Sequence, residues 1–188
     1  MKTSEIIVFI IYLAFMLGIG IFFFFKNKND LFAAIVDKPL KELCDMLTEH
    51  YMRDVQDMGS DDPAVLEAQY HIETHMELDK LVDCMYENYD VFMLLLTGAQ
   101  GSEYENVVDM LVDMTEKGFR LSAEKVLEKK PNCHIDEYML HWVTHISVDS
   151  YTHLLTHERD AEKAKLHMHK VMEFLIRIWF AMIVEEEE

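Results

Sequence analysis

Histidine is the residue type in this chain best suited to chemistry, and six of its ten copies form pairs spaced four residues apart. On a helix this spacing puts both imidazoles on one face, where they can chelate zinc or nickel once a third ligand approaches. Glu73, Asp149 or a histidine of a neighbouring helix would supply that ligand. The pairs are His71 and His75, His141 and His145, and His153 and His157. Chance spacing among ten histidines explains the pairs more simply, so we predict no metal site.

No arrangement typical of an enzyme accompanies the histidines. The sequence has no nucleophile elbow, no glycine-rich phosphate loop, and acidic residues so numerous that no pair of them stands out. Cys44, Cys84 and Cys133 are widely spaced and form no CxxC, which excludes an evident disulfide framework and fits a reducing compartment. We therefore predict that the chain is not an enzyme and needs no cofactor.

The elements that position these residues begin with an apolar segment. Residues 6–25 contain no charge, and a helix of twenty residues spans roughly 30 Å, the thickness of the hydrocarbon core of a bilayer. A helix buried in a soluble core usually keeps a polar face, which this segment lacks. We expect residues 6–25 to cross the inner membrane once, the alternative being a helix packed in the core. Lysines cluster after the segment, which places the C-terminal part in the cytoplasm.

After Asp30 the sequence predicts an all-α body of about six amphipathic helices. Three prolines and six glycines are too few for the turns of an all-β fold. Pro39 is expected to kink the first helix, and Ser102 with Glu105 forms a capping box that opens the fourth. The expected helices cover residues 31–51, 62–87, 90–98, 102–130, 135–157 and 161–184.

The charge balance limits the possible partners. The chain has a formal net charge of -18 at pH 7, and beyond Leu31 it carries 33 acidic residues against 14 basic ones. Binding to DNA through phosphate contacts requires clustered lysines and arginines. We therefore predict no specific binding of duplex DNA by this chain.

Two stretches resemble known families. Residues 6–30 resemble the opening transmembrane helix of sodium:solute symporters of the proline-symporter type, although nothing after Asp30 continues that pattern. The spacing Phe22-x-x-Phe25-x-x-Lys28-x-x-Leu31 matches the Y-x-x-F-x-x-K-x-x-L pattern of TetR/AcrR regulators. Downstream, residues 87–114 resemble the mid-domain helices of that family, and residues 156–183 resemble its final helix. This second resemblance covers about residues 22–184.

The TetR/AcrR resemblance implies a pocket for a small-molecule effector. In that family the pocket is wrapped by the mid-domain helices, and adaptable methionines suit such a surface. The side chains that fall on those helices here are Met85, Tyr89, Phe92, Met93, Leu96, Met110, Met114, Phe119 and Trp142. Apolar residues at helical spacing are more often plain core, so core packing is the alternative interpretation for each of these residues.

The same resemblance implies a homodimer, because the last two helices of the family form a four-helix bundle with their twins. The expected final helix carries a wider apolar stripe than it needs to pack on its own core. The implied interface comprises Trp142, Ile146, Tyr151, Val171, Phe174, Leu175, Ile178, Trp179 and Met182.

The chain departs from the family before Phe22. A member has its DNA-reading helices there, and a recognition helix needs polar and basic side chains that residues 13–23 lack. We expect a transmembrane-like segment at 1–28, an effector-binding and dimerisation domain at 29–184, and an acidic tail at 185–188.

The expected function is a TetR/AcrR-type ligand-sensing and dimerisation domain without a complete helix-turn-helix, tethered to the membrane and responding to an unknown small molecule. Two alternatives stay open. One is a non-functional product of gene fusion or truncation, which predicts the same fold. The other is a small membrane accessory protein whose helices only assemble with partners.

Overall fold

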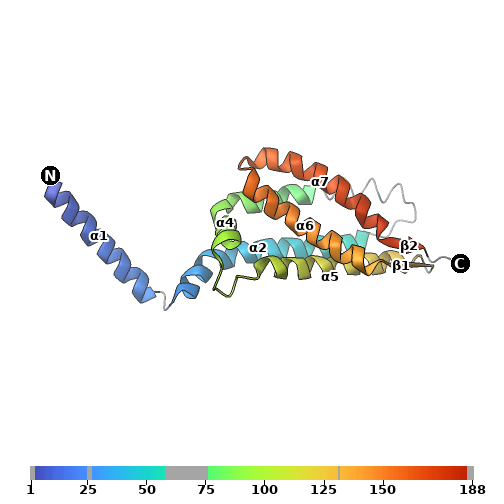
Figure 1. Ribbon diagram of the computed structural model, residues 1–188, viewed down its shortest axis with the longest axis horizontal. Coiled ribbons are helices and arrows are strands. Elements are labelled where there is room, and N and C mark those ends of the chain that lie inside the picture. Colours follow the sequence, from blue (N-terminus) through green and yellow to red (C-terminus); the bar gives the residue numbers. More distant parts are fainter. Residues whose placement is uncertain (1–2, 25–26, 58–75, 131, 186–188) are drawn as a thin grey trace.

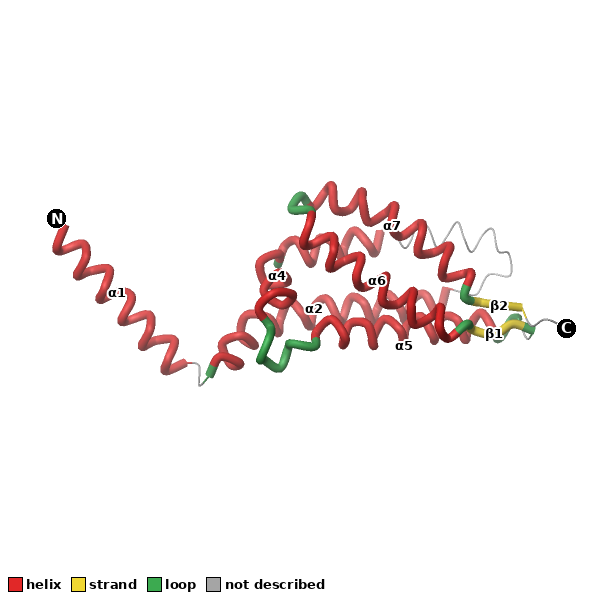
Figure 2. Tube along the Cα trace, in the orientation of Figure 1, coloured by secondary structure: helices red, strands yellow, loops and turns green. Residues whose placement is uncertain are grey.

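The computed structural model describes residues 3–24, 27–57, 76–130 and 132–185, and within some helices it leaves side chains undescribed. Helices dominate this part, which confirms the all-α class (Figure 1, Figure 2). Its elements are α1 (Thr3–Phe24), α2 (Lys28–Asp57), a helix seen over residues 76–87, α4 (Tyr89–Gly98), α5 (Val107–Leu127), β1 (Cys133–Ile135), α6 (Glu137–His157), α7 (Ala161–Ala181) and β2 (Ile183–Glu185).

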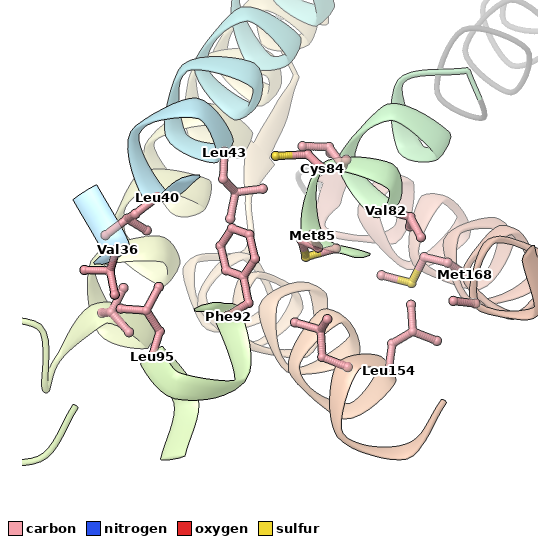
Figure 3. Close-up of a cluster of buried hydrophobic side chains, with 14 of the residues drawn as sticks. Val36, Leu40, Leu43, Val82, Cys84, Met85, Phe92, Leu95, Leu154 and Met168 are labelled. Carbon is pink, nitrogen blue, oxygen red and sulfur yellow. The ribbon is translucent and has the colours of Figure 1, made fainter. Parts of the chain in front are cut away.

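The helices after residue 27 form a bundle. Helix α5 packs against both α2 and α6, and α6 packs in turn against α7. The main core collects buried side chains from α2, residues 76–87, α4, α5, α6 and α7. In Figure 3 the ring of Phe92 points from α4 toward Leu43 of α2. A smaller cluster of Ala123, Leu140, Trp179 and Met182 closes the end of the bundle near the strands.

Helix α1 stands away from the bundle (Figure 1). Its large apolar side chains from Ile6 to Leu17 are between 43% and 66% exposed. Among the residues that the structure describes, no helix combines the length and the hydropathy that crossing a membrane requires.

Several helix boundaries agree with those predicted from the sequence, whereas one predicted N-cap does not. Helix α2 continues through the buried Pro39, and α4 ends at Gly98 as expected. The predicted capping box at Ser102 and Glu105 is wrong, because α5 begins only at Val107. The Glu105 carboxylate instead accepts a hydrogen bond from the backbone N–H of Gly101 within the preceding loop, at 2.9 Å. Of the helix expected over 62–87, residues 62–75 lie outside the described part of the chain.

A two-stranded ribbon was not expected from the sequence. Strand β1 pairs antiparallel with β2, with His134 opposite Val184. The backbone N–H of Asp136 also donates to the carbonyl of Met182 at 2.7 Å. The final helix therefore ends at Ala181 rather than at 184, because the β-branched Ile183 and Val184 find backbone partners in β1. Glu185, expected in the acidic tail, belongs to β2.

Candidate ligand cavity

Two adjoining cavities lie inside the bundle. The first has a volume of about 70 Å³. Its walls come from α2, residues 76–87, α4, α5 and α6, and they are mostly leucine, methionine and valine side chains. The lining residues are Leu43, Leu47, Tyr51, Leu81, Met85, Leu96, Leu111, Thr115, Ser147, Val148, Tyr151, Thr152 and Leu155. The spacing of four residues within α2, α5 and α6 brings these side chains to the inner face of each helix.

The second cavity continues toward the strand end of the bundle and has a volume of about 50 Å³. It shares Leu47, Tyr51, Leu81, Ser147 and Tyr151 with the first cavity. The remaining lining residues are His50, Phe119, Val143, Met172, Leu175, Ile176 and Trp179. The two phenol rings, Tyr51 and Tyr151, therefore stand where the cavities meet.

Most hydroxyl groups in the wall of the first cavity are already hydrogen-bonded to the protein. The hydroxyls of Tyr51 and Thr115 bond to each other at 3.0 Å. Ser147 donates to the carbonyl of Val143 at 2.8 Å, and Thr152 donates to the carbonyl of Asp149 at 3.0 Å.

Tyr151 is different. Within the described part of the chain, its hydroxyl makes no hydrogen bond to another residue. Burial is the main cause that raises the pKa of this phenol, with the neighbouring Tyr51 as the second cause. Tyr151 nevertheless keeps some accessible surface. This surface is consistent with the burial that raises its pKa, because the ring lines both cavities. An unpaired polar group in an apolar interior is costly, so this hydroxyl is available to water or to a ligand.

The cavity wall formed by residues 76–87 is fixed by polar contacts at its edges. Asp79 pairs with His169 of α7 at 2.8 Å, and Asp83 pairs with Lys165 of the same helix at 2.6 Å. On the other side, Glu77 pairs with Arg53 of α2 at 2.6 Å. These contacts join the wall to the two helices that flank it.

Three of the nine predicted pocket residues line a cavity. Met85 and Leu96 line the first cavity, and Phe119 lines the second. Phe92 is buried in the core, while Tyr89 and Met93 pack against that core and Met114 is half-buried. Met110 and Trp142 are each 43% exposed and lie outside both cavities.

The residues expected at a dimer interface divide into two groups. Leu175, Trp179 and Met182 are buried within their own chain, at 3% exposed or less, and Tyr151 faces the cavities. The members accessible to a second copy are Trp142, Ile146, Val171, Phe174 and Ile178. Self-association stays a prediction.

The polar cavity residues Tyr51, Thr115 and Ser147 were missed as site residues by sequence reasoning. Each is a hydroxyl-bearing side chain on the apolar face of its helix, and this is the signal that marks them. Tyr151 carries the same signal, four residues after Ser147, but was assigned to the dimer interface. The packing of α2 against α5 pairs Tyr51 with Thr115, whereas Ser147 finds its partner within α6.

The two described histidine pairs are not part of a metal-binding group. Among the described residues, no group of three or more His, Cys, Asp or Glu side chains is arranged to hold a metal ion. The rings of His153 and His157 stack at 4.0 Å, and those of His141 and His145 meet edge to face at 4.6 Å. His71 and His75 lie outside the described part of the chain.

The thiols of the buried Cys84 and the half-buried Cys44 are not activated. Burial raises the pKa of Cys84 to about 11, and burial likewise raises the pKa of Cys44. Both thiols are therefore protonated at neutral pH, whereas a nucleophilic cysteine needs its thiolate.

Comparisons with protein-family models, with curated protein sequences and with solved structures find no match to this chain.

Proposed function

We propose that this chain is a small-molecule-binding module, in which the helical bundle encloses the ligand and α1 holds the module at a membrane. The observation that carries the proposal is the pair of cavities between the helices, whose apolar walls include one hydroxyl that has no hydrogen-bond partner among the described residues. Ligand pockets are generally apolar with a few polar groups that fix orientation, and these cavities have that composition.

We further propose that the module is of the TetR/AcrR ligand-sensing type. The support is the motif from Phe22 to Leu31 and the resemblance of the mid-domain and final helices. The charge of -18 and the lack of basic clusters speak against DNA binding by this chain, so a ligand signal would pass to a partner protein instead.

Membrane attachment is proposed from α1. Lipid would bury the exposed apolar side chains of Ile6 to Leu17. This burial stabilises the bound state by about 25 cal/mol for each Å² of apolar surface removed from water. The uncharged run in the sequence extends to Phe25. We place the bundle on the cytoplasmic side of the inner membrane, because the lysines follow the apolar run.

The proposal is tested by fluorine NMR of 4-fluorotoluene added to the full chain in phosphatidylcholine nanodiscs. We expect a bound resonance distinct from the probe dissolved in lipid. At ten times its dissociation constant the probe adds about 1.4 kcal/mol of stability, which raises the unfolding temperature by about 4 °C.

The variant Val148→Phe supplies the site control, because Val148 is 7% exposed and lines the first cavity. A phenylalanine there fills the space and should remove the bound resonance, while circular dichroism checks that the helices remain. The same change at the exposed Val184 should leave binding intact. Equal binding by both variants would place the probe elsewhere. Absence of binding to the unchanged chain would favour a non-functional product or an accessory subunit.

A further inference from the structure

Among the hydroxyl groups of the cavity wall, that of Tyr151 is the one whose hydrogen-bonding capacity the described residues do not use. The Tyr51, Thr115, Ser147 and Thr152 hydroxyls each have a protein partner, whereas the Tyr151 hydroxyl has none within the described residues. Tyr151 also lines both cavities, so a molecule in either one lies beside its ring.

Charge and size limit what can enter. No lysine, arginine, aspartate or glutamate is among the described residues that line the two cavities. His50 lines the second cavity, but burial lowers its pKa to about 4, so it is neutral at pH 7. An apolar cavity of about 150 Å³ can bind benzene. The cavities of about 70 and about 50 Å³ are each smaller than this, so a molecule of one ring would have to occupy both of them, beside the Tyr151 ring that they share.

We propose that the ligand is an uncharged molecule of the size of one ring, carrying a hydroxyl group that hydrogen-bonds to the Tyr151 hydroxyl. The inference rests on the proposed function and adds the chemical class of the ligand. A hydroxyl both donates and accepts, so it can satisfy Tyr151 in either direction. A hydrocarbon of the same shape fills the cavity but leaves the tyrosine unpaired, which is costly.

The test compares two probes of nearly equal shape, 4-fluorophenol and 4-fluorotoluene, which differ by a hydroxyl in place of a methyl group. Both dissociation constants are measured by fluorine NMR on the full chain in nanodiscs. The readout is the ratio of the two constants, measured for the unchanged chain and for Tyr151→Phe under identical conditions. Comparing the ratios removes the different solubilities of the probes in lipid, which are the same for every variant.

In Tyr151→Phe we expect the affinity for 4-fluorophenol relative to 4-fluorotoluene to fall about 5-fold, the contribution of one neutral hydrogen bond. Tyr138→Phe is the matched control, because Tyr138 lies on the same helix and is 75% exposed. It should leave the ratio unchanged. Tyr151→Phe removes no hydrogen bond within the described protein, so its unfolding temperature should equal or exceed that of the unchanged chain.

The outcomes separate the two proposals. If both probes bind and the ratio is the same in Tyr151→Phe, the role of Tyr151 is overturned while the cavity remains a binding site. If neither probe binds the unchanged chain, the proposed function fails and the ligand class fails with it. A lower unfolding temperature for Tyr151→Phe than for Tyr138→Phe would show that the hydroxyl already has a structural partner, which also overturns the inference.

Discussion

His50 shows how one partly buried side chain couples stability to pH. It lies on α2 and lines the second cavity. Burial lowers its pKa from 6.5 to about 4, and nearby Arg53 adds to this effect while Glu77 opposes it. In the unfolded chain the same imidazole titrates near 6.5. Below that pH the unfolded state binds a proton that the folded state does not bind, so acid favours unfolding.

We therefore expect the free energy of unfolding to be highest above about pH 6.5 and to fall as the pH decreases toward about 4, by up to about 3 kcal/mol from this residue. Urea unfolding at pH 7 and pH 5 measures the change. In His50→Gln the difference between the two pH values should shrink, whereas His134→Gln, at an exposed position, should keep it. Equal pH dependence in both variants would contradict the prediction. The carboxyls whose pKa is lowered, such as Glu116 beside His141 and Arg120, lose their contribution only at lower pH.

At the scale of elements, the contact between α2 and α5 decides the shape of the cavities. Gly118 lies on α5 against the ring of Tyr51, and a Cβ atom at Gly118 would be 2.4 Å from Cγ of that ring. The absence of a side chain lets the two helices approach closely. The same approach brings Tyr51 within hydrogen-bonding distance of Thr115, three residues before Gly118.

Gly118→Ala should destabilise the protein although alanine favours helices. Overpacking against Tyr51 destabilises the folded state by about 1–3 kcal/mol. The higher helix propensity of alanine offsets only about 1 kcal/mol of this loss. Gly18→Ala in α1 is the control, because a Cβ there meets nothing within 4 Å. Urea unfolding should show a loss for Gly118→Ala and none for Gly18→Ala. A Gly118→Ala protein as stable as the control would mean that the helices separate without cost.

For the molecule as a whole, α1 is the element that the bundle leaves uncovered. If lipid covers it, charges on α1 should weaken membrane binding while charges on the bundle should not. We expect the full chain to float with phosphatidylcholine vesicles, and the double variant Ile10→Lys, Phe15→Lys to stay largely unbound, since each lysine at the centre of a membrane helix costs about 2.5–3.5 kcal/mol.

The control for this flotation experiment places the same charges on exposed apolar residues of the bundle, as Met52→Lys, Leu166→Lys. This variant should float like the unchanged chain. If the α1 variant floats equally well, or if the unchanged chain remains in solution, the proposed attachment through α1 is contradicted.

The sequence by itself determined the class of the fold, because local signals suffice for it. Apolar residues at helical spacing identified α2, α4, α5, α6 and α7, and Gly98 marked the end of α4. The sequence could not determine the ribbon of β1 and β2, because that pairing joins residues about fifty positions apart and overrides the helical pattern of Ile183. It also could not assign Tyr151, since an apolar face looks the same whether it meets a core, a cavity or a second chain. The tertiary structure decided this when α2, α5 and α6 came together, paired the hydroxyl of Tyr51 with that of Thr115, and left space beside the Tyr151 ring, whose hydroxyl has no hydrogen-bond partner among the described residues.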